Sequence, residues 1–203
     1  RLTNVDWPHA IAMSYDGKYL LVSDNERILH RWNRTTGDYQ SVRIPSFMTQ
    51  ISAHPSKYLA VINNAEGDIN NDGTVCDFEK MKVVNKIPAN HRHQYYKYLS
   101  VSILATWNND APVIKILDSQ MLKETQRIEG TSVDSNEMFL DKGKEHILLY
   151  DKNEVSLWSV KTAQKIHTWP MALDNMIQDT ENKNLFYSFE KKQRRNCKYL
   201  MEV

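Results

Sequence analysis

Two short segments decide the fold class of this chain. They are Ser14-Tyr15-Asp16-Gly17-Lys18-Tyr19-Leu20-Leu21 and Ile28-Leu29-His30-Arg31-Trp32-Asn33. Asp16-Gly17 is typical of a tight turn, and the runs that flank it are short and rich in branched and aromatic residues. Apolar residues at helical spacing are scarce in both segments. The two segments therefore predict β-strands joined by a turn.

Similar runs recur along the whole chain of 203 residues. Each is four to seven residues long, rich in Val, Ile, Leu, Tyr and Trp, and bounded by turn residues. The runs are Ala10–Met13, Tyr19–Val22, Ile28–Trp32, Tyr39–Ile44, Tyr58–Ile62, Leu99–Ala105, Val113–Leu117, Ile147–Tyr150, Val155–Val160 and Leu185–Phe189. We therefore expect an all-β protein.

Two markers in the sequence indicate an internal repeat of about forty residues. The first is a lysine after a turn and before a strand, at positions 18, 57, 97, 144 and 183. The second is a bulky residue that ends the next strand, at Trp32, Phe78, Leu117, Trp158 and Tyr199. Extra residues between the markers, 63–72 and 107–112, are expected to lengthen surface loops.

A repeat of this length with four short strands is typical of a propeller blade. A single blade is apolar on both faces and gains stability by stacking on its neighbours. We expect one domain with about five four-stranded blades, at residues 5–45, 46–88, 89–129, 130–170 and, in part, 171–203.

The quoted residues resemble the WD40-repeat family. Ser14–Leu21 with Ile28–Asn33 resembles that family's strand–turn–strand core, and Glu154–Ser159 is similar to its third strand. The resemblance implies structural roles for five residues, Trp32, Trp158, Asp16, Gly17 and Gly143. The family's Gly-His pair is missing and its Trp-Asp pair is Trp32-Asn33 here, so we expect its Asp–His–Ser–Trp network to be incomplete.

The same resemblance implies a rigid, non-catalytic platform that binds other proteins within a complex. Proteins of that family usually have seven blades, so we expect further blades from a longer parent chain, from unbuilt segments or from a partner. An open series of blades would expose strand edges and apolar faces.

Composition narrows the functional classes. The 26 Lys and Arg residues nearly balance the 25 Asp and Glu residues, so no global charge attracts nucleic acid or a membrane surface. No apolar run approaches the roughly 18 residues that cross a bilayer, so no membrane insertion is expected. The only cysteines, Cys76 and Cys197, favour an intracellular location, cytoplasmic or nuclear, over a disulfide framework.

The segment from Asp68 to Glu79 fits the calcium-loop pattern D-x-[DN]-x-[DN]-G-x₅-E in full. Its candidate ligands are the oxygens of Asp68, Asn70, Asp72, Thr74 and Glu79. The repeat register instead makes residues 74–78 a strand and 68–73 a hairpin loop that needs no metal. We therefore expect no cofactor. The alternative is calcium, bound by a metal-binding propeller or by a hydrolase with a central metal.

A basic cluster near the end of the chain is a further candidate site. It comprises Lys191, Lys192, Arg194, Arg195 and Lys198. Such a cluster can contact RNA phosphates or act as a nuclear-import signal, but solvated charge is also ordinary in a loop between strands. No nucleophile elbow, phosphate-binding glycine loop or other catalytic motif occurs, so we expect no enzymatic activity.

Overall fold

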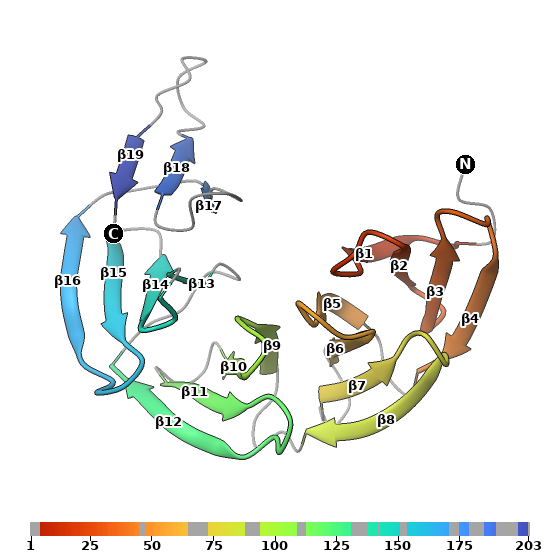
Figure 1. Ribbon diagram of the computed structural model, residues 1–203, viewed down its shortest axis with the longest axis horizontal. Coiled ribbons are helices and arrows are strands. Elements are labelled where there is room, and N and C mark those ends of the chain that lie inside the picture. Colours follow the sequence, from red (N-terminus) through yellow and green to blue (C-terminus); the bar gives the residue numbers. More distant parts are fainter. Residues whose placement is uncertain are drawn as a thin grey trace. The chain divides into compact units, whose positions relative to one another are not determined.

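The fold consists of antiparallel strands arranged in successive sheets (Figure 1). The computed structural model describes residues 5–44, 48–64, 73–87, 94–108, 113–130, 138–141, 143–150, 154–170, 175–178, 185–189 and 199–202. Two compact units emerge: residues 1–110 with 116–124, and residues 111–115 with 125–203. Within the described ranges, no helix has the length and hydropathy that a membrane span requires.

Each sheet is built from consecutive strands. Sheet 1 contains β1 (Pro8–Met13), β2 (Tyr19–Asp24), β3 (Ile28–Asn33) and β4 (Tyr39–Arg43). Sheet 2 contains β5 (Met48–Ala53), β6 (Leu59–Asn64), β7 (Gly73–Asp77) and β8 (Lys82–Ile87). Sheet 3 contains β9 (Gln94–Tyr98), β10 (Ile103–Asn108), β11 (Val113–Asp118) and β12 (Glu124–Glu129).

The remaining strands form two further sheets. Sheet 4 contains β13 (Met138–Leu140), β14 (His146–Tyr150), β15 (Glu154–Ser159) and β16 (Lys165–Pro170). In sheet 5 the described residues form three strands, β17 (Asn175–Gln178), β18 (Leu185–Phe189) and β19 (Tyr199–Glu202). The prediction of an all-β chain with four-stranded sheets is confirmed for four sheets, and the described part of the fifth has three strands.

The repeat is present, but both markers are displaced in some copies. The amides of Ser14, His54 and Asp141 donate to the carbonyls of Tyr19, Leu59 and His146. These matching turns make Tyr58 and Glu145 the equivalents of Lys18. The lysine marker is therefore wrong at Lys57 and Lys144, and Lys97 lies inside β9. An exposed turn lysine is not held by packing, so its position is free to change from copy to copy.

The second marker needs a similar correction in sheet 2. The second-to-last residue of the third strand is the equivalent position in sheets 1 to 4. It is occupied by Trp32, Cys76, Leu117 and Trp158. Phe78 lies beyond the end of β7 and is fully buried. Trp107, expected in an inserted loop, lies in β10 and is also buried.

Sheets 1 and 2 share a hydrophobic core. Sheet 1 contributes its packed face, which we define as Ala10, Ala12, Tyr19, Leu21 and Leu29. Sheet 2 contributes buried residues of β5, β6 and β7, namely Ile51, Ala60, Ile62 and Cys76. Because side chains alternate along a strand, the other face of sheet 1 points away from this core.

Candidate interaction face

The face of sheet 1 opposite the shared core carries a row of large apolar side chains. Met13, Leu20, Trp32 and Tyr39 are paired one after another across β1 to β4. Residues directly opposite one another on neighbouring strands lie on the same face. Together with Ile11, they define what we call the open face.

Three of the five side chains of the open face are exposed to solvent. Ile11 is 66% exposed, Met13 is 48% exposed and Tyr39 is 37% exposed. Leu20 and Trp32 are half-buried. An apolar patch with central aromatic residues is typical of a protein-interaction site.

Equivalent positions in the next two sheets show how unusual this exposure is. The matching turns of sheets 1 and 2 place Ile51 where sheet 1 has Ile11, and Ile51 is 8% exposed. In sheet 3 the same position is held by Tyr96, which is fully buried. The same position, occupied by the same residue type in two sheets, is therefore covered in one sheet and open in the other.

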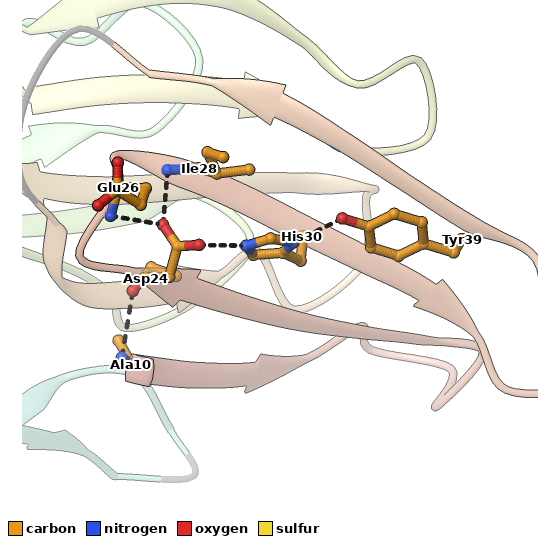
Figure 2. A network of polar contacts seen from close by, with 7 residues as sticks. Ala10, Asp24, Glu26, Ile28, His30 and Tyr39 are labelled. Carbon is orange, nitrogen blue, oxygen red and sulfur yellow. Dashed lines mark hydrogen bonds and ion pairs between the residues drawn. The ribbon is translucent and has the colours of Figure 1, made fainter. Parts of the chain in front are cut away.

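A buried polar network lies on the same side of sheet 1 as the open face, because Val22 is paired with both Ile11 and His30 (Figure 2). His30 Nε2 lies 2.7 Å from Asp24 Oδ2, and His30 Nδ1 lies 2.8 Å from the Tyr39 hydroxyl. The other carboxylate oxygen of Asp24 accepts hydrogen bonds from the amides of Glu26 and Ile28. His30 and Asp24 are each 1% exposed.

This network fixes the position of Tyr39. With a neutral ring, His30 Nε2–H donates to Asp24 and the Tyr39 hydroxyl donates to Nδ1, so every group has a partner. The Trp32 ring is stacked on His30 at 5.7 Å and lies 5.3 Å from Tyr39. A carboxylate, imidazole and hydroxyl in series can also activate a nucleophile. Here the hydroxyl is phenolic and the imidazole is buried, so the geometry supports orientation of Tyr39.

A second polar cluster joins the turns of sheets 1 and 2. Asp16 accepts hydrogen bonds from the hydroxyls of Tyr58 and Ser14, at 2.6 and 2.7 Å. The Tyr58 bond and then the Ser14 bond lower the pKa of Asp16 to about 2. Gly17, the next residue, has a backbone φ of +70°, a conformation in which a residue with a side chain would be strained.

Two further residues expected to have structural roles, Trp158 and Gly143, belong to sheet 4, and Trp32 belongs to the open face. Trp158 is 5% exposed, and its indole N–H donates to Ser156 Oγ at 2.9 Å. At the turn of sheet 4, Lys144 has the left-handed φ of +61°. The residue equivalent to Gly17 in this turn is therefore Lys144, and the expected role of Gly143 as the turn glycine is wrong by one position.

The structure does not bring the described calcium candidates together. Thr74 lies in β7 and is 1% exposed, and about 10 Å of strand separates it from Asp77. Glu79 follows the far end of β7, where its backbone carbonyl accepts a hydrogen bond from Arg31. Asp68, Asn70 and Asp72 lie outside the described residues. Within the described ranges, no cluster of three or more His, Cys, Asp or Glu side chains is placed to hold a metal ion.

The basic cluster of Lys191, Lys192, Arg194, Arg195 and Lys198 lies outside the described residues. The open face, in contrast, was not identified from the sequence. Its signal was the alternation of Ala10 and Ala12 with Ile11 and Met13 in β1, which has large apolar residues on one face only.

Comparisons with known proteins support the architecture alone. No family model matches the chain, and no curated protein matches it significantly. A solved structure of Kuenenia stuttgartiensis hydrazine synthase is similar, with a TM-score of 0.73 and 13% identity. The match covers 93% of this chain and 56% of that chain. At this identity the likeness supports a propeller-like all-β fold and carries no information about activity.

Proposed function

We propose that this protein is a non-catalytic scaffold that binds other proteins through the open face of sheet 1. The observation that carries the proposal is the exposure of Ile11 beside the burial of its equivalent Ile51. In stacked sheets this position is normally covered, so an exposed copy offers an apolar surface of the right kind for a partner.

The composition of the open face agrees with a binding role. Trp32 and Tyr39 are aromatic, and aromatic residues dominate the energetics of protein interfaces. The bond to His30 holds Tyr39 in place, so little side-chain entropy is lost when a partner binds. We extend the proposal to a WD40-like propeller whose sheets are blades of a larger assembly, in line with the resemblance at Ser14–Asn33.

A photo-crosslinking amino acid at position 11 tests this function. Introduced in place of Ile11 in the cell of origin, it should form adducts with a defined protein, because that position would lie inside the interface. The matched control is the same probe at Val84, which is 45% exposed but lies on β8 of sheet 2.

Adducts at position 11 that are absent at position 84 would support the scaffold. Equal labelling at both positions, or none at position 11, would contradict it. The identity of the adduct then gives the partner.

A further inference from the structure

We propose that Tyr15 and Tyr58 form an oxidative crosslinking site, at which a one-electron oxidant joins the two phenol rings by a carbon–carbon bond. The oxidant belongs to the class that a haem peroxidase generates from hydrogen peroxide. The bond links a turn of sheet 1 to a turn of sheet 2, so that a non-covalent contact between the sheets becomes covalent. The inference goes beyond partner binding and uses no residue of the open face.

The first step of the argument is the placement of the two rings. Tyr15 lies in the turn between β1 and β2, and Tyr58 lies between β5 and β6. Their ring centroids are 5.4 Å apart, and the ring planes are inclined by 33°. Phenol rings couple through the carbons next to the hydroxyl groups. Rings already in contact can bring these carbons together by rotation about their side-chain bonds.

The second step is a proton acceptor beside one of the rings. The Tyr58 hydroxyl donates a hydrogen bond of 2.6 Å to Asp16 Oδ2. A phenol that loses an electron becomes a strong acid, so its proton passes along this bond to the carboxylate. The bond to Asp16, then burial and then the hydroxyl of Tyr15 raise the pKa of Tyr58. The two phenol oxygens are therefore close to each other, as are the carbons beside them.

The third step is selectivity between two neighbours of Tyr58. Tyr15 is 50% exposed, so an oxidant can reach it from solvent, whereas Tyr19 is 5% exposed. The Tyr19 ring is 5.2 Å from that of Tyr58 but nearly perpendicular to it, at 80°. Cations of Arg31 and Lys18 lie 4.7 and 4.9 Å from the Tyr19 centroid, and Lys18 lies 5.8 Å from that of Tyr58. Positive charge opposes loss of an electron, so Tyr15 is the favoured partner.

The reaction balances in atoms and electrons. Each tyrosine loses one electron and its phenolic proton, and the two radicals join at ring carbons next to the oxygens. The proton on each joined carbon then moves through solvent to the phenol oxygen, which restores both aromatic rings. The two electrons and two protons released reduce hydrogen peroxide to two molecules of water at the peroxidase.

The crosslink should stabilise the packing of sheets 1 and 2. It closes the loop of chain between positions 15 and 58, and a crosslink of this kind restricts the unfolded chain. Because the two rings already touch in the native fold, few native contacts have to change. The crosslinked protein should therefore unfold at a higher urea concentration than the untreated protein.

Peroxidase treatment of the full chain at low protein concentration, followed by tryptic digestion, tests the proposal. Tyr15, Tyr19 and Tyr58 fall in peptides 2–18, 19–27 and 58–80, each with a single tyrosine. The main product should be 2–18 joined to 58–80, lighter than their sum by two hydrogen atoms. Dityrosine fluorescence should fall in Tyr15→Phe, which keeps the ring but forms no phenoxyl radical. Tyr95→Phe, in sheet 3, is the matched control and should leave the product unchanged.

Two further conditions check that the folded chain directs the reaction. The yield should fall in urea, because the two rings are held together only by the fold. A mixture of unlabelled and heavy-nitrogen-labelled chains should give no product that combines both labels. Absence of the 2–18 to 58–80 product would overturn the proposal, as would a main product that contains 19–27, an equal yield in urea or a product formed only between chains.

Discussion

At the scale of single residues, His54 is held in one tautomer by its neighbours. The Ser56 amide donates to His54 Nδ1 at 3.1 Å, and His54 Nε2–H donates to the Val101 carbonyl at 3.2 Å. The ring also packs edge-on against Tyr98 at 4.9 Å. Protonation of Nδ1 would remove the bond from Ser56, so the fold favours the neutral ring.

The pH dependence of stability should reflect this. Burial, followed by the charge of Lys57, lowers the pKa of His54 below its usual 6.5. The unfolded chain therefore binds a proton on this residue before the native state does. The stabilisation is complete above about pH 6.5 and is progressively lost as the pH falls below that value.

Urea unfolding at about pH 7.5 and about pH 5.5 measures the effect. The wild type should lose more stability between the two values than His54→Gln, which cannot titrate at this position. The difference between the two proteins removes the contribution of the other histidines. An identical loss in both would show that His54 is not the responsible group.

Arg31 is a buried cation that ties sheet 1 to sheet 2. Its guanidinium donates to the carbonyls of Phe78 and Glu79 at 2.9 and 2.8 Å, and to Gln40 at 2.7 Å. Arg31→Met keeps most of the packing but leaves these acceptors without a donor, which should cost about 3 kcal/mol. Arg34→Met is the control, because Arg34 is exposed, and it should cost less than about 1 kcal/mol.

Urea unfolding of both variants checks this prediction. A loss in Arg31→Met no larger than in Arg34→Met would mean that the two carbonyls are satisfied without the guanidinium.

Glu79 provides the residue-scale test of calcium binding. An extended β7 separates Glu79 from Thr74, so we expect the same heat of calcium addition for the wild type and Glu79→Gln. Isothermal titration calorimetry of both proteins makes the comparison. Heat and thermal stabilisation that disappear only in Glu79→Gln would instead support the calcium-loop pattern.

At the scale of elements, the turn after the third strand recurs in sheets 1 to 4, and a different residue occupies its left-handed position in each sheet. Gly37, Met81, Leu122 and Ala163 all have left-handed φ values, between +49° and +79°. Gly37 and Ala163 donate to the carbonyls of Asn33 and Ser159 in the same way, at 2.8 and 2.9 Å. Among these four described turns, only that of sheet 1 has a glycine at the position that favours one.

Exchange of residue types between two of these turns should have opposite effects. Gly37→Ala should destabilise by about 1 kcal/mol through backbone strain alone, because nothing lies within 4 Å of the added Cβ. Ala163→Gly should stabilise by about 0.5 kcal/mol, since relief of strain exceeds the entropy lost by glycine. Thermal unfolding measures both. Changes of the same sign would show that the two turns are not equivalent.

These turns also explain how far the sequence could predict the elements. Trp32 and Trp158 were correctly paired, because a large residue packed in a strand is constrained by its surroundings. Phe78 was wrongly paired, since a bulky residue just beyond a strand resembles one at its end. Strand β8 was not predicted, because its Val83 and Val84 lie between lysines in an otherwise exposed outer strand.

At the scale of the whole molecule, the candidate site depends on the packing between sheets, because Ile51 of sheet 2 is covered by sheet 1 whereas Ile11 of sheet 1 is exposed. Ile11 and Ile51 have the same chemistry in matching strands, so no local pattern distinguishes the exposed residue from the buried one. The Asp24–His30–Tyr39 network was also hidden, because its members come from three strands whose register the sequence did not give. The fold class could be predicted from strands and turns, but the site required the packing between sheets.

The same pair of isoleucines gives the most direct test of this packing. Ile51→Lys would bury a charge among the residues shared by sheets 1 and 2, and should cost about 4 kcal/mol. Ile11→Lys places the same charge at a position that is 66% exposed, and should change stability by less than about 0.5 kcal/mol. Urea unfolding at low protein concentration compares the free energies of unfolding of the two variants. A large loss in Ile11→Lys under those conditions would mean that the open face is already covered within one chain, and the surface proposed for partners would not be available to them.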